Sequence, residues 1–180
     1  MRRAAVFLDR DGVINRAPCR RGRPHPPAGL HELEILPDVP EALRALKAGG
    51  YALIVVTNQP DVARGTRTRR EVEDIHRRLE RDLAIDAILC CFHDGDSCGC
   101  RKPRPGLLLQ AARDFAIELP SSFMVGDRWS DIEAGRRAGC GTFFVDRGYQ
   151  ETRPEHPDHR VRSLGHAADI ILAESHALPR

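Results

Sequence analysis

The chain is poor in aromatic residues: Phe, Trp and Tyr make up 5% of its 180 residues. Proteins that hold single-stranded nucleic acid stack its bases on aromatic side chains, so this composition offers little for such a surface. An excess of one charge is also lacking, because 28 Lys and Arg stand against 26 Asp and Glu, for a formal net charge of +2. Nucleic-acid-binding domains usually carry a basic excess. We therefore expect no nucleic acid partner.

Long apolar runs are absent as well. The apolar run that follows the two arginines near the start covers residues 4–8 and stops at Asp9, whereas a signal peptide needs about 7–15 apolar residues. No later segment approaches the roughly 20 apolar residues of a transmembrane helix. We expect a cytoplasmic protein with no membrane partner. Because cytosolic thiols stay reduced, clustered cysteines there more often bind metal or take part in catalysis than form disulfides.

The length corresponds to one domain, since domains run to about 100–200 residues, and we predict a single domain over residues 1–180. Apolar runs predict strands at residues 4–8, 51–56, 84–89, 123–126, 142–146 and 168–172. Helices are predicted between them at residues 37–50, 68–83, 105–115 and 130–139. This alternation is typical of an α/β domain with a mainly parallel sheet flanked by helices. Two insertions, at about 16–36 and 90–103, are longer than a connection requires.

Polar residues gather where the predicted strands end. They are "DRDG" at 9–12, "TNQ" at 57–59, "CGCRKP" at 98–103 and "GDRWSD" at 126–131. Taken singly, each pattern is a common turn or a solvated surface charge. In an open α/β sheet, however, ligands bind beyond the carboxyl ends of the strands. Their joint placement therefore predicts one site that combines carboxylates, a hydroxyl and a lysine.

The second insertion contains four of the six cysteines, in "CCFHDGDSCGC". Cys91, His93, Cys98 and Cys100 offer three thiolates and an imidazole, which is a donor set of tetrahedral structural zinc. Cys90 is left over, and the pattern does not decide whether it joins the site. A disulfide and a redox motif are the weaker alternatives.

The four motifs "FLDRDGVIN", "VVTNQPDVARG", "CFH…CGCRKPRPG" and "VGDRWSDIEAG" follow one another over about residues 5–148. In this the chain resembles the haloacid dehalogenase-like (HAD) phosphatases. It is most similar to the branch that holds the heptose 1,7-bisphosphate 7-phosphatases and the histidinol-phosphate phosphatases. The resemblance implies a Rossmann-like domain without a large cap domain and with a zinc loop of this C-x-H…C-x-C layout.

The resemblance also implies a Mg²⁺-dependent phosphomonoesterase that forms an aspartyl-phosphate. Asp9 would be the nucleophile and Asp11 the general acid and base. The Mg²⁺ would be held by Asp9, the Asp11 backbone carbonyl and Asp127. Thr57 and Lys102 would complete the catalytic set by binding the transferred phosphoryl group.

Other residues are implied to bind substrate around this centre. The backbone amides of Asn58 and Gln59 would hold phosphate oxygens, and Asp131 would hold Lys102 in place. The predicted substrate contacts outside the phosphate site are Ala17, Pro18, Cys19, Arg20, Arg101 and Arg128. Two departures from the family pattern bear on the substrate. Pro60 removes a backbone donor after "TNQ", and Arg128 replaces a lysine with a different shape.

The leading hypothesis is removal of the 7-phosphate from D-glycero-D-manno-heptose 1,7-bisphosphate by a monomer. Histidinol phosphate or another small sugar phosphate is the alternative substrate. A zinc-loop binding module without catalysis is an alternative of another class, although it would have no need for all the predicted catalytic residues. A polynucleotide 3′-phosphatase is disfavoured by the balanced charge.

Overall fold

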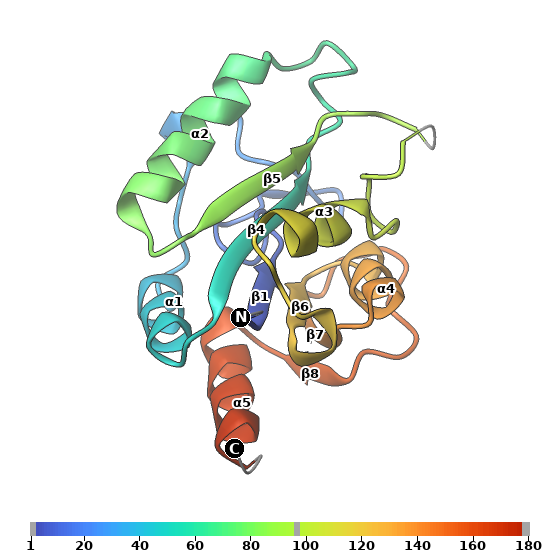
Figure 1. The fold of residues 1–180 in the computed structure, drawn as a ribbon. Helices are drawn as coiled ribbons and strands as arrows, with labels where there is room; N and C mark the ends of the chain where they lie inside the picture. Colours follow the sequence, from blue (N-terminus) through green and yellow to red (C-terminus); the bar gives the residue numbers. More distant parts are fainter. Residues whose placement is uncertain (1–2, 96–97, 178–180) are drawn as a thin grey trace.

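The computed structural model describes residues 3–95 and 98–177. Residues 96–97 of the second predicted insertion, and both ends of the predicted 1–180 domain, lie outside the described residues. The centre is a six-stranded sheet in the order β5-β4-β1-β6-β7-β8, and every neighbouring pair is parallel (Figure 1). Its strands are β1 (Ala5–Leu8), β4 (Ala52–Asn58), β5 (Ala87–Cys91), β6 (Phe123–Gly126), β7 (Gly141–Val145) and β8 (His159–Val161). The predicted α/β class with a parallel sheet is confirmed.

Helices cover both faces of the sheet (Figure 1). On one face lie α1 (Val39–Ala48), α2 (Arg69–Asp82) and α5 (Leu164–Ala177), and on the other α3 (Gly106–Asp114) and α4 (Trp129–Ala138). Successive side chains of a strand point to opposite faces. Accordingly Val6 and Leu8 of β1 pack with the first layer of helices, and Ala5 and Phe7 with the second. All four are fully buried, so the central strand is fixed from both sides.

The predicted start of α2 is confirmed. The hydroxyl of Thr68 accepts a hydrogen bond from the Glu71 N–H (3.2 Å), and the Glu71 carboxylate accepts one from the Thr68 N–H (2.7 Å). This capping box satisfies backbone donors that the first turn leaves unpaired. Val72, Ile75 and Leu79 form the buried stripe of the helix.

The strand predicted at 168–172 is wrong, because this segment lies inside α5. Leu164, Ala167, Ala168 and Ile171 are buried at helical spacing, and the helix packs against α1. A short apolar run does not by itself distinguish a strand from a buried helix. The sixth strand is instead β8, whose polar sequence was not recognised as a strand.

The first insertion, between β1 and α1, is small. Its described elements are the antiparallel hairpin of β2 (Cys19–Arg20) and β3 (Arg23–Pro24) and the 3₁₀ helix η1 (Leu30–Glu32). This confirms the prediction that the insertion holds no large cap domain. Among the helices of the described residues, none is long and apolar enough to cross a membrane.

Candidate active site

A cavity of about 350 Å³ lies at the carboxyl ends of β1 and β4, under the loops that follow. Its wall includes Asp9, Asp11, Thr57, Asn58, Gln59, Arg101, Lys102, Arg128 and Asp131. These residues come from four separate segments, and the parallel sheet brings them to one edge. The predicted convergence of the strand-end motifs is therefore present.

Lys102 lies between two carboxylates at the bottom of the cavity. Its Nζ is 2.7 Å from Oδ1 of Asp9 and 2.7 Å from Oδ1 of Asp131, and it also donates to the Val56 carbonyl (2.8 Å). Burial alone would lower the pKa of Lys102, but the negative charges of Asp131 and Asp9 outweigh it and raise the pKa. Burial raises the pKa of Asp9 to about 6, against the opposing effect of Lys102. The ammonium thus remains charged beside the carboxylate.

Asp127 supplies a buried carboxylate next to Asp9. Both of its oxygens are buried without a hydrogen bond of standard geometry among the described residues, and the Tyr149 hydroxyl is the neighbouring donor. Carboxylate oxygens of Asp9, Asp127 and Asp131 lie within 4.8 Å of one another. A Cβ on Gly12, whose φ is +90°, would stand only 1.8 Å from Oδ2 of Asp127, so only glycine leaves this space open. Because Mg²⁺ prefers a few carboxylates together with water and phosphate oxygens, this oxygen cluster fits a magnesium ion.

Asp131 is less available to a metal ion than Asp127, although it lies in the same cluster. One of its oxygens faces Lys102, and the other accepts the Arg128 backbone N–H (3.0 Å) at the start of α4. Both oxygens are occupied by the protein, whereas those of Asp127 accept no hydrogen bond of standard geometry from the described residues. The expected contact between Asp131 and Lys102 is present.

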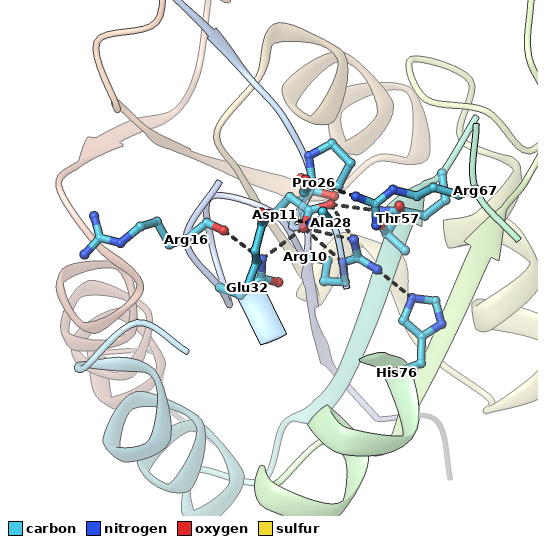
Figure 2. Close-up of polar contacts among 12 residues, drawn as sticks. Arg10, Asp11, Arg16, Pro26, Ala28, Glu32, Thr57, Arg67 and His76 are labelled. Atoms are coloured by element: carbon cyan, nitrogen blue, oxygen red, sulfur yellow. Dashed lines mark hydrogen bonds and ion pairs between the residues drawn. The ribbon is translucent and has the colours of Figure 1, made fainter. Parts of the chain in front are cut away.

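Three side chains donate hydrogen bonds to Asp11, and one of them is Arg10 (Figure 2). Arg10 donates to both of its oxygens, Asn15 donates to Oδ1 (3.0 Å) and the Gln59 side chain donates to Oδ2 (2.9 Å). Burial alone would raise the pKa of Asp11, but the charge and hydrogen bonds of Arg10, with those of Asn15 and Gln59, lower it overall. Asp11 is therefore a carboxylate in a fixed orientation.

The "TNQ" segment acts mainly through its side chains. The Gln59 side chain donates to the Thr57 hydroxyl (3.0 Å), and that of Asn58 exchanges hydrogen bonds with the backbone of Lys102 (3.1 and 3.2 Å). The Gln59 backbone N–H donates to the Cys91 carbonyl (2.8 Å). This corrects the expectation that the Gln59 amide binds phosphate, because continued pairing of β4 with β5 already uses it.

Cys91, His93, Cys98 and Cys100 form a compact cluster. Sγ of Cys91 is 3.1 Å from Sγ of Cys100 and 3.7 Å from Sγ of Cys98, and Nδ1 of His93 is 3.3 Å from Sγ of Cys100. Thiolates bound at about 2.3 Å around a tetrahedral zinc stand roughly 3.8 Å apart. The cluster therefore fits a zinc ion. Cys90, which lies in β5, is a free thiol outside this group.

The outer wall of the cavity differs from the prediction. Arg23, Pro24, His25 and Pro26 line it, while Ala17, Pro18, Cys19 and Arg20 do not. The reason is the hairpin: β2 and β3 pair Cys19 with Pro24 and Arg20 with Arg23, and it is β3 and the residues after it that border the cavity. The sequence showed no period that would have revealed the hairpin.

The two arginines that were predicted to contact the substrate, Arg101 and Arg128, line the cavity, but each already donates hydrogen bonds to another residue of the protein. The Arg128 guanidinium donates to both oxygens of Glu151 (2.9 and 2.7 Å), and Arg101 donates to the His93 carbonyl (3.1 Å). Glu151 was not recognised in the sequence, since it lies in a polar segment without a motif. Arg10 could have been found, because it lies between two predicted catalytic aspartates.

Known proteins are similar to this chain in sequence and in fold. The family model described as HAD-hydrolase-like matches residues 99–167. A D-glycero-β-D-manno-heptose-1,7-bisphosphate 7-phosphatase of Escherichia coli K12 is 35% identical over 98% of this chain and 92% of its own. A Salmonella typhi protein of the same name is 40% identical over 94% of both chains.

Solved structures agree. The D,D-heptose 1,7-bisphosphate phosphatase of B. bronchiseptica, complexed with magnesium and phosphate, superposes with a TM-score of 0.79 at 30% identity, covering 95% of this chain and 99% of that one. A putative HAD-like phosphatase of Mesorhizobium loti has a TM-score of 0.77 at 28% identity, over 99% and 88% of the two chains. Full-length relatives above 30% identity and the matching fold lead to one assignment. The chain belongs to the HAD-like hydrolases, in the family of the D-glycero-β-D-manno-heptose-1,7-bisphosphate 7-phosphatases.

Proposed function

We propose that this protein is a Mg²⁺-dependent phosphatase that removes the 7-phosphate of D-glycero-β-D-manno-heptose 1,7-bisphosphate. The observation that carries the proposal is the buried arrangement of Asp9, Lys102 and Asp127. The Asp9 carboxylate, which would be the nucleophile, lies there beside a fixed positive charge and close to the buried carboxylate of Asp127. The relatives that are 35% and 40% identical to this chain carry the name of that activity.

The magnesium site would be formed by Asp9, Asp127 and the backbone carbonyl of Asp11. A carboxylate that approaches a phosphate dianion meets charge repulsion, and a bound Mg²⁺ would supply the charge that offsets it. The buried oxygens of Asp127 support this assignment.

The protein's own residues would divide the hydrolysis into two displacements. Asp11 first takes up a proton from solvent. In the first displacement, an oxygen of Asp9 bonds to phosphorus, the ester P–O bond breaks, and the sugar oxygen takes that proton from Asp11. In the second, a water oxygen bonds to phosphorus, the bond to Asp9 breaks, and Asp11 receives a proton from the water. Lys102 would supply a fixed positive charge beside the phosphoryl group, and the Thr57 hydroxyl would hold one of its oxygens, while charge develops there.

The charge of the outer wall supports a bisphosphate over histidinol phosphate. Arg23, Arg64, Arg101 and Arg128 contribute to the wall. Its two outer carboxylates already face arginines, Asp61 at 3.5 Å from Arg64 and Glu151 at 2.7 Å from Arg128. An imidazole and an ammonium group would need unpaired carboxylates, whereas this wall has four guanidinium groups against two outer carboxylates. Guanidinium groups bind phosphate well, so the excess of positive charge favours a second phosphate.

The test is phosphate release with Mg²⁺ from three substrates at matched low concentration: the heptose bisphosphate, histidinol phosphate and fructose 1,6-bisphosphate. Asp9→Asn serves as the blank, and we expect it to lower turnover by on the order of 10⁴-fold or more. A preference for the heptose supports the proposal. Similar slow rates on all three would reject the heptose as substrate, and normal turnover by Asp9→Asn would reject the nucleophile.

A further inference from the structure

Arg10 is a charged side chain with no exposed surface, and it lies between Asp11 and a histidine of α2 (Figure 2). One edge of its guanidinium donates to Asp11 through Nε (3.1 Å) and Nη2 (2.8 Å). Its Nη1 lies 3.1 Å from Nε2 of His76. Arginine has five N–H donors and no acceptor, so a buried guanidinium keeps one orientation only if its neighbours accept from it.

His76 is suited to be such an acceptor. It is 8% exposed and occupies the buried face of α2 one residue after Ile75. Burial, and then the charge of Arg10, lower the pKa of His76 to about 3. The ring is neutral near neutral pH, and a neutral imidazole offers one nitrogen lone pair, which the geometry directs to Arg10.

The position of His76 is fixed independently of the site. The capping box of Thr68 and Glu71 begins α2, and Val72 and Leu79 anchor the same face in the core. A well-packed helix therefore presents the imidazole, which orients the guanidinium, which in turn orients a carboxylate of the cavity.

We propose that His76 is a positioning residue for the hydrolysis of the aspartyl-phosphate, acting on Asp11 through Arg10. The inference rests on the proposed function, in which Asp11 receives the proton of the attacking water. Without an acceptor at position 76, a buried Nη1 donor loses its partner. The guanidinium is then free to turn away from Asp11, and the carboxylate loses its fixed orientation toward the water.

The test uses 4-nitrophenyl phosphate with the Mg²⁺-loaded enzyme. Its nitrophenolate leaves without needing a proton, so the first displacement does not depend on Asp11, whereas water attack on the phosphoenzyme does. For His76→Leu we expect a first turnover close to that of the wild type. We expect the steady-state rate to fall about 10-fold, as is usual when a residue behind a catalytic group is lost. Phosphoenzyme trapped by acid quench should rise accordingly.

Two further variants separate positioning from packing. His76→Gln retains an acceptor oxygen, and we expect it to restore the steady-state rate to within about 3-fold of the wild type. Val72→Ala removes buried volume from α2 but none of the hydrogen bonds of Arg10. We expect it to leave the ratio of first-turnover to steady-state rates unchanged.

The outcomes are distinct. If His76→Leu lowers first-turnover and steady-state rates by the same factor, or changes neither, His76 has no positioning role. If His76→Gln is as slow as His76→Leu, the hydrogen bond is not the cause. Failure of the proposed function looks different, because the wild type would then release no phosphate from the heptose bisphosphate, or Asp9→Asn would retain turnover.

Discussion

The ammonium group of Lys102 is held 2.7 Å from Oδ1 of Asp131, and both side chains are almost completely buried. With Asp9 and the Val56 carbonyl, Asp131 accounts for all three N–H donors of the lysine. Lys102 follows the Cys and His cluster in the chain, and Asp131 lies in the first turn of α4. The contact therefore joins the cluster loop to the sheet edge where Asp9 and Asp127 lie.

Asp131→Asn should lower kcat/KM by about 10–100-fold, because it removes a charge that orients Lys102 without touching the substrate. It should also lower the thermal unfolding temperature, since Lys102 then has less compensation for its burial. Steady-state kinetics and thermal melts check both effects. Asp74→Asn, which loses only an exposed ion pair with Arg77, is the control and should change neither. Wild-type kcat/KM in Asp131→Asn would contradict this role.

Cys98→Ser should lower the bound zinc and the unfolding temperature, and activity should fall with them. The reason is that the loop which ends in Lys102 would lose the ligands that fix its path. Metal analysis, melts and phosphate release measure the three effects. Cys19→Ser, which changes an exposed cysteine outside the cluster, should retain the zinc. A protein that keeps both stability and activity after zinc removal would exclude a structural metal.

Arg128→Ala should lower kcat/KM for the heptose bisphosphate by about 10–100-fold, because the loss of one hydrogen bond between charged groups has an effect of this size. It should affect 4-nitrophenyl phosphate much less, because that substrate has no second phosphate for the outer wall to bind. Arg136→Ala is the matched control, since Arg136 is an exposed α4 arginine paired with Glu133. Equal losses on both substrates would place Arg128 at the transferred phosphoryl group instead.

Because of Asp86, the free energy of unfolding should depend on pH in the acid range. Burial alone would raise its pKa, but the hydrogen bond from the Leu53 N–H (2.7 Å) and the ammonium of Lys47 lower the pKa overall. Because the pKa of Asp86 is lower in the folded protein than the unfolded-state pKa of about 3.9, its ionisation stabilises the fold at pH values above about 3.9. This stabilisation is lost as the pH falls through the folded-state pKa. Asp86→Asn should therefore reduce the free energy of unfolding by about 1 kcal/mol near neutral pH. Urea titrations should show the difference from wild type shrinking below about pH 4; a constant difference would contradict this.

The strand-end motifs could be predicted because each is local. Asp9 follows a run of apolar residues that forms the buried strand β1, and Thr68 with Glu71 carries the capping signal of α2 in four residues. The spacing of the cysteines also predicted a metal cluster. Only the structure shows that Cys91 belongs to this cluster and Cys90 does not. Local patterns did not predict the structure where a strand and a buried helix have the same apolar pattern. Residues 168–172 are such a case, and they form part of α5, which packs against α1.

The sequence by itself determined the α/β class, the order of the main elements from β1 to β7, and the identities of the acids, the lysine and the thiols. The reason is that hydrophobic periodicity and motif spacing are properties of neighbouring residues. Only the tertiary structure decided which side chains hold these functional groups in place. The pairing of β2 with β3 put Arg23 rather than Arg20 at the cavity, and α2 brought His76 to Arg10 across 66 positions of sequence. Such contacts depend on how distant elements pack against one sheet, and no local pattern contains that information.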